Sequence, residues 1–255
     1  GAGDLETAIG TLVATNSTSG DIVIAESNGL IISSAVTSAG NGNIDINTAA
    51  GAFTVSGAIT AHGSGDVTLL ATGGLLTINA AVTSTTGDLS LTGGTGVTHN
   101  ASGNLTTTGV GTITVAASTG NITMADGTVY STGSGTVSLT AATSVILGAV
   151  TTTSSTIGIT ATAGSITETT AAETANITSS GTVTLTAATG IGASGAGDLE
   201  TAIGTLVATN STSGDIVIVE TDTLTISGTG LRTLSGNGNI TLTISAGTLS
   251  INANV

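Results

Sequence analysis

The pentapeptide Gly-Asp-Ile-Val-Ile at residues 20–24 is the first clear instance of a short pattern that recurs along the chain. The pattern consists of a glycine, a small polar residue and two aliphatic residues separated by one position. It returns as Gly-Asn-Ile-Asp-Ile at residues 42–46 and as Gly-Asp-Val-Thr-Leu at residues 65–69. Because successive side chains of a β-strand point to opposite faces, this alternation predicts short strands that are each buried on one face.

Ten such aliphatic pairs follow one another at a nearly constant interval. Their first members are separated by steps of 20 to 26 residues, except for one step of 33 residues. Weaker alternating stretches, such as Leu76-Thr77-Ile78, lie between the pairs and supply two further strands for each step. Three strands of about four to five residues, joined by Gly-rich corners, fill one coil of a β-solenoid with a triangular cross-section.

The predicted fold is therefore an all-β parallel β-solenoid, or β-helix, with about 22–24 residues and three short strands per coil. Each coil is too small to bury a core alone, so its aliphatic residues must stack on those of its neighbours. The predicted core ladder consists of Ile22, Ile24, Ile44, Ile46, Val67, Leu69, Leu89, Leu91, Ile113, Val115, Val137, Leu139, Ile157, Ile159, Val183, Leu185, Ile216, Ile218, Ile240 and Leu242.

A long internal repeat contains these coils. Residues 1–26 and 195–220 are identical except that Ala25 is replaced by Val219, which marks a tandem duplication with an offset of 194 residues. We divide the chain into residues 1–194, one unit of about eight coils, and residues 195–255, the start of the next copy. The copies realign beyond residue 26 only if the second contains two inserted residues, somewhere within 228 to 235.

The 33-residue step is the irregular part of the first unit, because it contains about ten more residues than one coil needs. This insertion could be one helical turn, with Asp198 as the N-cap and Gly204 as the C-cap. A protruding loop or an elongated coil would accommodate it equally well.

The composition excludes several functional classes. Fifteen acidic residues against Arg232 and no lysine give a formal net charge of −14, so no nucleic-acid partner is expected. No run of 18 apolar residues is present, and we expect no membrane insertion. A hydrophobic content of 39% argues against disorder. The scarcity of sites for trypsin-like proteases suits a fibre outside a cell.

The acidic and histidine residues predict structural roles. Asp21, Asp66, Asp88 and Asp215 share the position after a corner glycine, where asparagine also occurs and where Asx side chains satisfy turn backbone. Calcium ligation is a weak alternative, since isolated carboxylates do not supply six to eight oxygen ligands. His62 and His99 lie among small polar residues and are expected to face solvent, so no metal site or other cofactor is predicted.

No catalytic residues are predicted. The chain has no Gly-x-Ser-x-Gly motif between a strand and a helix, and one tyrosine and one phenylalanine leave few aromatic platforms for a sugar substrate. We therefore expect a protein that is not an enzyme. Among seven Asn-x-Ser/Thr sequons, Asn16 and its duplicate Asn210 are the better candidates for glycosylation, because both lie in a predicted loop.

The patterns Gly-Asp-Ile-x-Ile, Gly-Thr-Val-x-Leu-Thr-Ala and Gly-Asn-Ile-Thr, taken over about 230 residues, resemble exoproteins of the filamentous-haemagglutinin type. The resemblance implies a long right-handed parallel β-helix that bacteria secrete, often by two-partner secretion, as a surface adhesin or matrix fibre.

These observations predict a non-catalytic structural protein, extracellular or on the cell surface, whose coils stack into a stiff filament. Its expected partner is a further copy of itself, joined head to tail or laterally, because neither end of the sequence resembles a polar cap. One alternative is a surface adhesin stalk of the filamentous-haemagglutinin type. A lesser alternative is an ice-binding solenoid, which needs one flat and regular face of threonine residues.

Overall fold

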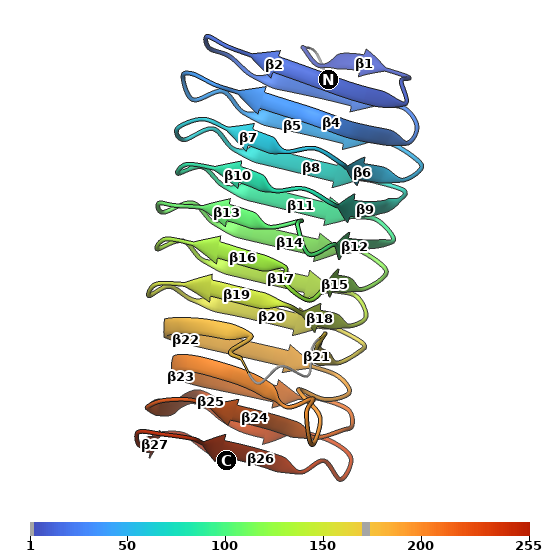
Figure 1. Ribbon diagram of the computed structural model, residues 1–255. Coiled ribbons are helices and arrows are strands. Elements are labelled where there is room, and N and C mark those ends of the chain that lie inside the picture. The colour runs from blue at the N-terminus through green and yellow to red at the C-terminus, as the bar shows by residue number, and fades with distance from the viewer. Residues whose placement is uncertain (1–2, 170–173) are drawn as a thin grey trace.

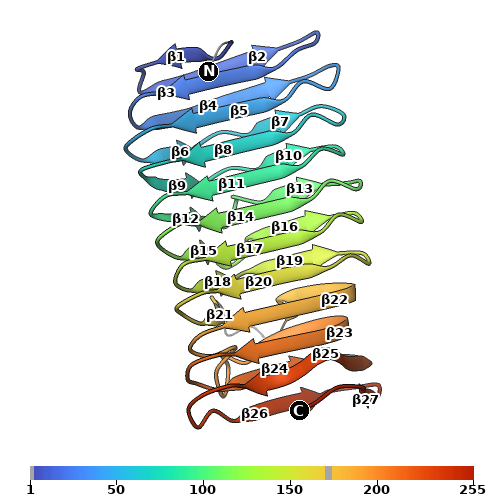
Figure 2. The same cartoon turned by 180° about the vertical axis from the view of Figure 1, so that it is seen from behind.

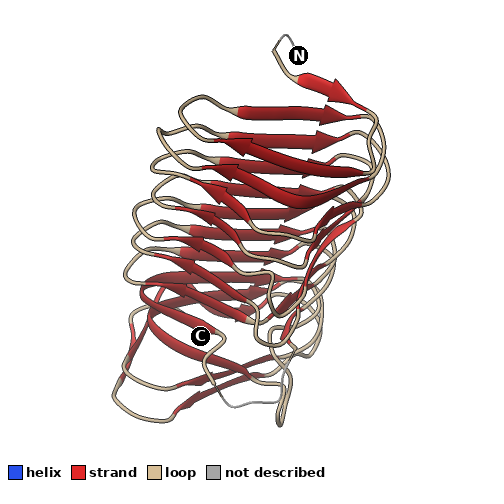
Figure 3. Ribbon diagram, turned by 45° about the horizontal axis from the view of Figure 1, so that its top comes forward, coloured by secondary structure: helices blue, strands red, loops and turns tan. Residues whose placement is uncertain are grey.

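The computed structural model describes residues 3–169 and 174–255, which form 27 strands and no helix. The strands pair in parallel and wind into a β-solenoid of about 11 turns, with the two ends of the chain at opposite ends of the rod (Figure 1; Figure 3). The predicted fold class is therefore confirmed.

Three strands make up each regular turn. One has five residues and forms what we call the straight side of the solenoid, which faces the viewer in Figure 2. The strands of the straight side are β3 (Ile22–Glu26), β5 (Ile44–Thr48), β8 (Val67–Ala71), β11 (Leu89–Gly93), β14 (Ile113–Ala117), β17 (Val137–Ala141) and β20 (Ile157–Ala161).

The other two strands of each turn form what we call the kinked side, because the single strand β4 (Leu30–Thr37) pairs with both of them in the next turn. The first row contains β6 (Phe53–Val55), β9 (Leu75–Ile78), β12 (Gly96–His99), β15 (Ile122–Met124), β18 (Val145–Leu147) and β21 (Ile166–Glu168). The second row contains β7 (Ile59–Ala61), β10 (Val82–Ser84), β13 (Leu105–Thr107), β16 (Val129–Thr132) and β19 (Ala149–Thr152).

The remaining strands lie near the two ends of the rod. They are β1 (Leu5–Thr7), β2 (Thr11–Asn16), β22 (Ile177–Ala187), β23 (Leu199–Asn210), β24 (Ile216–Glu220), β25 (Leu224–Thr233), β26 (Ile240–Ile244) and β27 (Leu249–Ile251).

The core is a set of axial ladders of inward aliphatic side chains. On the straight side, Ile44 pairs with Ile22 and Val67, and the ladder continues in register to Val183. The predicted ladder residues from 44 to 185 are at most 1% exposed, whereas Ile240 and Leu242 are only partly buried. Burial of each such side chain contributes about 1.5–3 kcal/mol, which makes the stacked ladders the main source of stability.

The corner glycines of the repeating pattern are required by close contact between turns. A Cβ atom at Gly65 would collide with the carbonyl oxygen of Gly42, and one at Gly87 would collide with that of Gly65. Only glycine lets the backbones of successive turns approach this closely, which explains why a glycine precedes most of the strands on the straight side.

The 33-residue step contains a complete turn that the pattern did not reveal. Val183 of β22 is followed on the ladder by Leu206 of β23, so Ile216 is not its neighbour. Ile216 instead stacks on Ile191, which stacks on Ile166 of the kinked side. The predicted ladder order is therefore wrong at this point.

Of the alternatives for the insertion, the helical turn from Asp198 to Gly204 is wrong, because Leu199–Asn210 forms the long strand β23. Leu199 and Ile203 are buried, and the strand pairs in parallel with β22, so pairing and apolar burial outweigh the local capping signal. A short loop does precede the strand, where Ala193 forms an antiparallel bridge with Gly197.

The predicted two-residue insertion in the second copy is confirmed as a bulge in β25. Leu206 pairs with Ile226, but Ala208 pairs with Leu231, whereas the first copy places only one extra residue at this position. Gly228 and Gly230 have φ values of 59° and 82°, which glycine adopts without strain.

Candidate functional site

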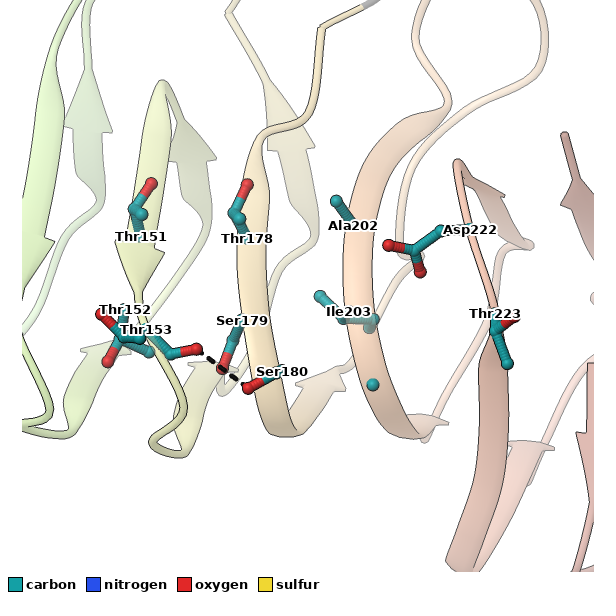
Figure 4. A pocket seen from close by; sticks show the side chains of 11 residues that line it. Thr151, Thr152, Thr153, Thr178, Ser179, Ser180, Ala202, Ile203, Asp222 and Thr223 are labelled. Atoms are coloured by element: carbon teal, nitrogen blue, oxygen red, sulfur yellow. Dashed lines mark hydrogen bonds between the residues drawn. The ribbon is translucent and has the colours of Figure 1, made fainter. Parts of the chain in front are cut away.

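An open groove crosses four neighbouring turns at the edge where the kinked side meets the straight side (Figure 4). Its volume is about 630 Å³. Its lining consists mainly of hydroxyl-bearing and small residues, namely Thr151, Thr152, Thr153, Thr178, Ser179, Ser180, Ala202, Ile203, Gly204, Asp222 and Thr223.

The groove spans the boundary between the two copies. Its threonine and serine wall comes from β19 and β22 of the first unit, and its other wall comes from residues 202–204 and 222–223 of the second. The hydroxyl of Ser180 donates to the carbonyl oxygen of Thr153 at 2.9 Å, and that of Ser179 donates to the carbonyl oxygen of Ser155 at 2.7 Å. The lining contains one carboxylate, on Asp222, and no histidine that could activate a hydroxyl.

A buried glutamate occupies the same position in both copies. The carboxylate of Glu26 accepts a hydrogen bond from the Thr7 hydroxyl at 2.7 Å and one from the Ile9 backbone N–H at 2.9 Å. Glu220 accepts the equivalent bonds from Thr201 at 2.8 Å and Ile203 at 3.2 Å. Each carboxylate therefore fixes the corner of the preceding turn, which is a structural role that the sequence did not indicate.

The pKa values of the two glutamates are shifted in opposite directions. Burial opposes ionisation of Glu26, but hydrogen bonds from Ile9, Thr7 and Asn28 outweigh it and hold the pKa of Glu26 below its usual value. Burial raises the pKa of Glu220, and the negative charge of Asp222 raises it further. Position 222 is the duplicate of Asn28, so a single change of asparagine to aspartate adds a like charge beside this carboxyl.

His99 is buried, so the expectation that it faces solvent is wrong. It lies in the kinked-side ladder, where its two neighbours, Ile78 and Met124, are apolar and buried. Its Nδ1 lies 2.7 Å from the carbonyl oxygen of Gly103, and its ring packs edge-on against Tyr130 with centroids 5.0 Å apart. Burial lowers the pKa of His99 to about 4 and raises that of Tyr130.

The imidazole Nε2 of His99 and the phenolic oxygen of Tyr130 are buried and have no hydrogen-bond partner within the described ranges. This pair is enclosed by the core, so its rings contribute to packing and are closed to a ligand from solvent. His62, by contrast, is exposed at a corner, where its Nδ1 lies 2.7 Å from the carbonyl oxygen of Gly40.

The Asp and Asn residues after the corner glycines form an axial chain of hydrogen bonds. Asp21 Oδ1 accepts from the backbone N–H of Asn43 at 2.7 Å, Asn43 Oδ1 accepts from Asp66 at 2.9 Å, and Asp66 Oδ1 accepts from Asp88 at 2.8 Å. Asp215 makes the same bond to Asn239 at 2.7 Å. The residues thus satisfy turn backbone as expected. Within the described part of the chain, no three acidic or histidine side chains are grouped to hold a metal ion.

The two candidate glycosylation sites have structural contacts of their own. The side-chain amide of Asn16 donates to the carbonyl oxygens of Ser19 and Gly20, and that of Asn210 donates to the equivalent Ser213 and Gly214. Asn210 is 1% exposed because the preceding turn covers it. A glycan at Asn210 would have to displace these bonds, and glycosylation of either residue stays a prediction.

Among the described residues, no helix has the length and apolar character needed to cross a membrane. No protein-family model matches the chain, and comparison with curated proteins and with solved structures gives no significant match.

Proposed function

We propose that this protein is a structural rod, an element of an extracellular filament, in which tandem copies of the 194-residue unit stack without interruption. The proposal rests on the junction between the two copies. There, β22 at the end of the first unit pairs in parallel with β23 at the start of the second, and Val183 packs on Leu206 within one continuous core.

The junction supports this function because the residues that stack on the preceding unit are present at the start of both copies. Residues 5–16 and 199–210 are identical, so β2 has the same edge that β23 offers to β22. In the described structure this edge of β2 is open: the inward Leu12 is only partly buried, whereas its duplicate Leu206, which β22 covers, is fully buried. An open strand edge of this kind pairs readily with a further strand. In a tandem array, the strand that stacks on such an edge has the sequence of β22, as it does on β23. Within this chain β22 is already paired with β23, so end-to-end growth of single chains brings β2 against β26 and β27, which each pair with one neighbour within the described residues.

Electron microscopy of the whole chain tests the proposal. We expect concentration-dependent rods longer than the roughly 50 Å that about 11 turns span, with density repeating at about 4.8 Å along the axis. Ala14→Asp places a charge at an inward position of the β2 edge and is expected to block end-to-end growth. Thr15→Asp, at the adjacent outward position, adds the same charge and should leave growth intact.

Discrete single rods at every concentration would overturn self-assembly as the function. Equal loss of growth in both variants would assign association to general electrostatics instead of edge pairing, and would also contradict the proposal. An adhesin stalk uses the same rod, and it would be favoured if single rods bound a cell surface through one end.

One observation favours ice binding as a second candidate. The second row of the kinked side presents an outward hydroxyl in six successive turns, at Thr60, Thr83, Thr106, Ser131, Thr151 and Thr178. Thermal hysteresis that Thr106→Lys abolishes would support this function. A solution without hysteresis or ice shaping would exclude it.

A further inference from the structure

We infer that one 194-residue unit contains eight turns and half of a ninth, so that successive units present the same residues on opposite sides of the rod. The extension to a long array rests on the proposed function, whereas the half-turn offset itself is a property of this chain.

The first observation is the position of a duplicated leucine. Leu12 pairs with Ile32, whose ladder continues through Val55 and Ile78 on the kinked side. Its duplicate Leu206 stacks instead on Val183, at the end of the straight-side ladder. The same residue in the same local sequence therefore lies on different sides in the two copies.

The second observation is the reverse exchange. Ile22 begins the straight-side ladder through Ile44, whereas its duplicate Ile216 stacks on Ile191 and Ile166 in the kinked-side ladder. A rotation by one third of a turn would move both residues to the next side in the same sense. An exchange of the two sides requires about half a turn.

The number of turns follows from the ladder itself. Eight steps separate Ile22 from Leu206, through residues 44, 67, 89, 113, 137, 157 and 183. Ile216 lies beyond Leu206 on the opposite side, and so completes the half turn.

The side exchange takes place in long strands that pass around an edge. β22 and β23 each run from the second row of the kinked side onto the straight side, and their pairing has a register shift between Ser179 and Thr182. Inward residues remain inward throughout, since Ser179 faces Ile203 and Val183 faces Leu206. The half turn therefore costs no exposure of apolar side chains at this junction.

The offset moves each surface feature to the other edge of the rod. The loop that contains Thr18 lies at one edge, where Gly20 contacts Gly42 in the next turn. The identical loop that contains Thr212 lies at the other edge, where its backbone N–H bonds to Ala188 in a stack of corners that begins at residues 26–28. In an array, the groove at each junction would alternate between opposite edges every 41 Å or so, with a full period of about 82 Å.

Pairs of spin labels on the whole chain test the offset directly, because the natural sequence has no cysteine. One double variant is Thr18→Cys with Thr212→Cys, which labels the same loop in both copies. The other is Ser27→Cys with Thr212→Cys, which labels two corners of the same edge. All three positions are exposed.

With the half turn, the first pair is separated by about 41 Å along the axis and by about 20 Å across the rod, and the second by about 38 Å along one edge. Double electron–electron resonance should therefore give a distance about 7 Å longer for Thr18 and Thr212 than for Ser27 and Thr212. A whole number of turns would reverse this order and overturn the inference.

The measurement is made on single chains, so a failure of filament growth leaves its result unaffected. Circular dichroism of each labelled variant, compared with the parent chain, verifies that the solenoid is intact. If filaments form, density for the loop at residues 192–198 that recurs on one edge only would also contradict the alternation.

Discussion

Replacement of His99 by methionine should remove a large part of the acid sensitivity of the fold. His99 lies between Ile78 and Met124 in an apolar ladder, and burial lowers its pKa to about 4. In the unfolded chain this imidazole has its ordinary pKa of 6.5. Between these two values the unfolded state binds the proton more readily than the folded state, so stability falls as the pH falls. A pKa that falls from 6.5 in the unfolded chain to about 4 in the folded chain corresponds to about 3 kcal/mol of folding stability lost between pH 7 and pH 4.

The assay is urea unfolding of the parent chain, of His99→Met and of His62→Gln at pH 7, 5.5, 4.5 and 4. His62→Gln is the matched control, because it removes the only other imidazole from an exposed corner. Carboxyl groups also titrate in this range, but their contribution is common to all three proteins. The expected result is a difference between His99→Met and the parent that grows by about 3 kcal/mol on going to pH 4.

At pH 7 the same substitution has opposing effects. It removes the contact between Nδ1 and the Gly103 carbonyl, worth about 0.5–1.5 kcal/mol, and it also removes the unpaired buried Nε2, which costs about 1–3 kcal/mol. The expected net change is therefore small. Parallel pH curves for parent and His99→Met, or a His99 resonance that titrates near pH 6.5 by NMR, would refute the burial argument.

Three further predictions concern the ladder and the corners. Leu139→Ala should destabilise the chain by about 2–5 kcal/mol in urea unfolding, whereas Ser138→Ala, one residue away on the outside, should change stability by less than about 0.5 kcal/mol. Asp66→Ala should cost about 0.5–1.5 kcal/mol, because the Asp88 N–H loses its acceptor, and Asp66→Asn should retain that bond and stability; equal losses would contradict the axial chain. Asp222→Asn should lower the pKa of Glu220, which carboxyl NMR can measure. The raised pKa of Glu220 makes the folded state less stable as the pH rises from 4.5 through the folded-state pKa. The substitution should therefore increase stability at pH 7 by a few tenths of a kcal/mol.

The fold could be predicted from the sequence because each turn repeats one short sequence pattern. A glycine, a small polar residue and two aliphatic residues specify a corner and a one-sided strand, and the next turn stacks on it in register. His99 was missed because histidine is not part of that pattern. Alignment of Thr98-His99 with Thr77-Ile78 and Thr123-Met124 would nevertheless have placed His99 at an inward position. The buried Glu26 and Glu220 could not be found in this way, since their partners lie in the preceding turn.

The half turn could not be read from the same pattern for a physical reason. Alternation with a period of two residues fixes which side chains point inward, but it does not tell on which side of the coil a strand lies. The missed turn does contain the pattern, at Gly204-Thr205-Leu206-Val207-Ala208. It was not recognised because its second apolar residue is alanine instead of a larger aliphatic residue.

Because a strand of this pattern can lie on either side of the coil, a duplication of 194 residues is compatible with the fold. A strand with two inward residues can stack on the straight side or on the kinked side, as Leu12 and Leu206 demonstrate with identical sequence. A duplicated segment therefore does not have to contain a whole number of turns. It has to preserve the inward and outward alternation and to place its glycines at corners, as Gly204 does beside Ser180. Growth of such an array by duplication is constrained by the two-residue period of the strand more strongly than by the period of about 23 residues of the coil.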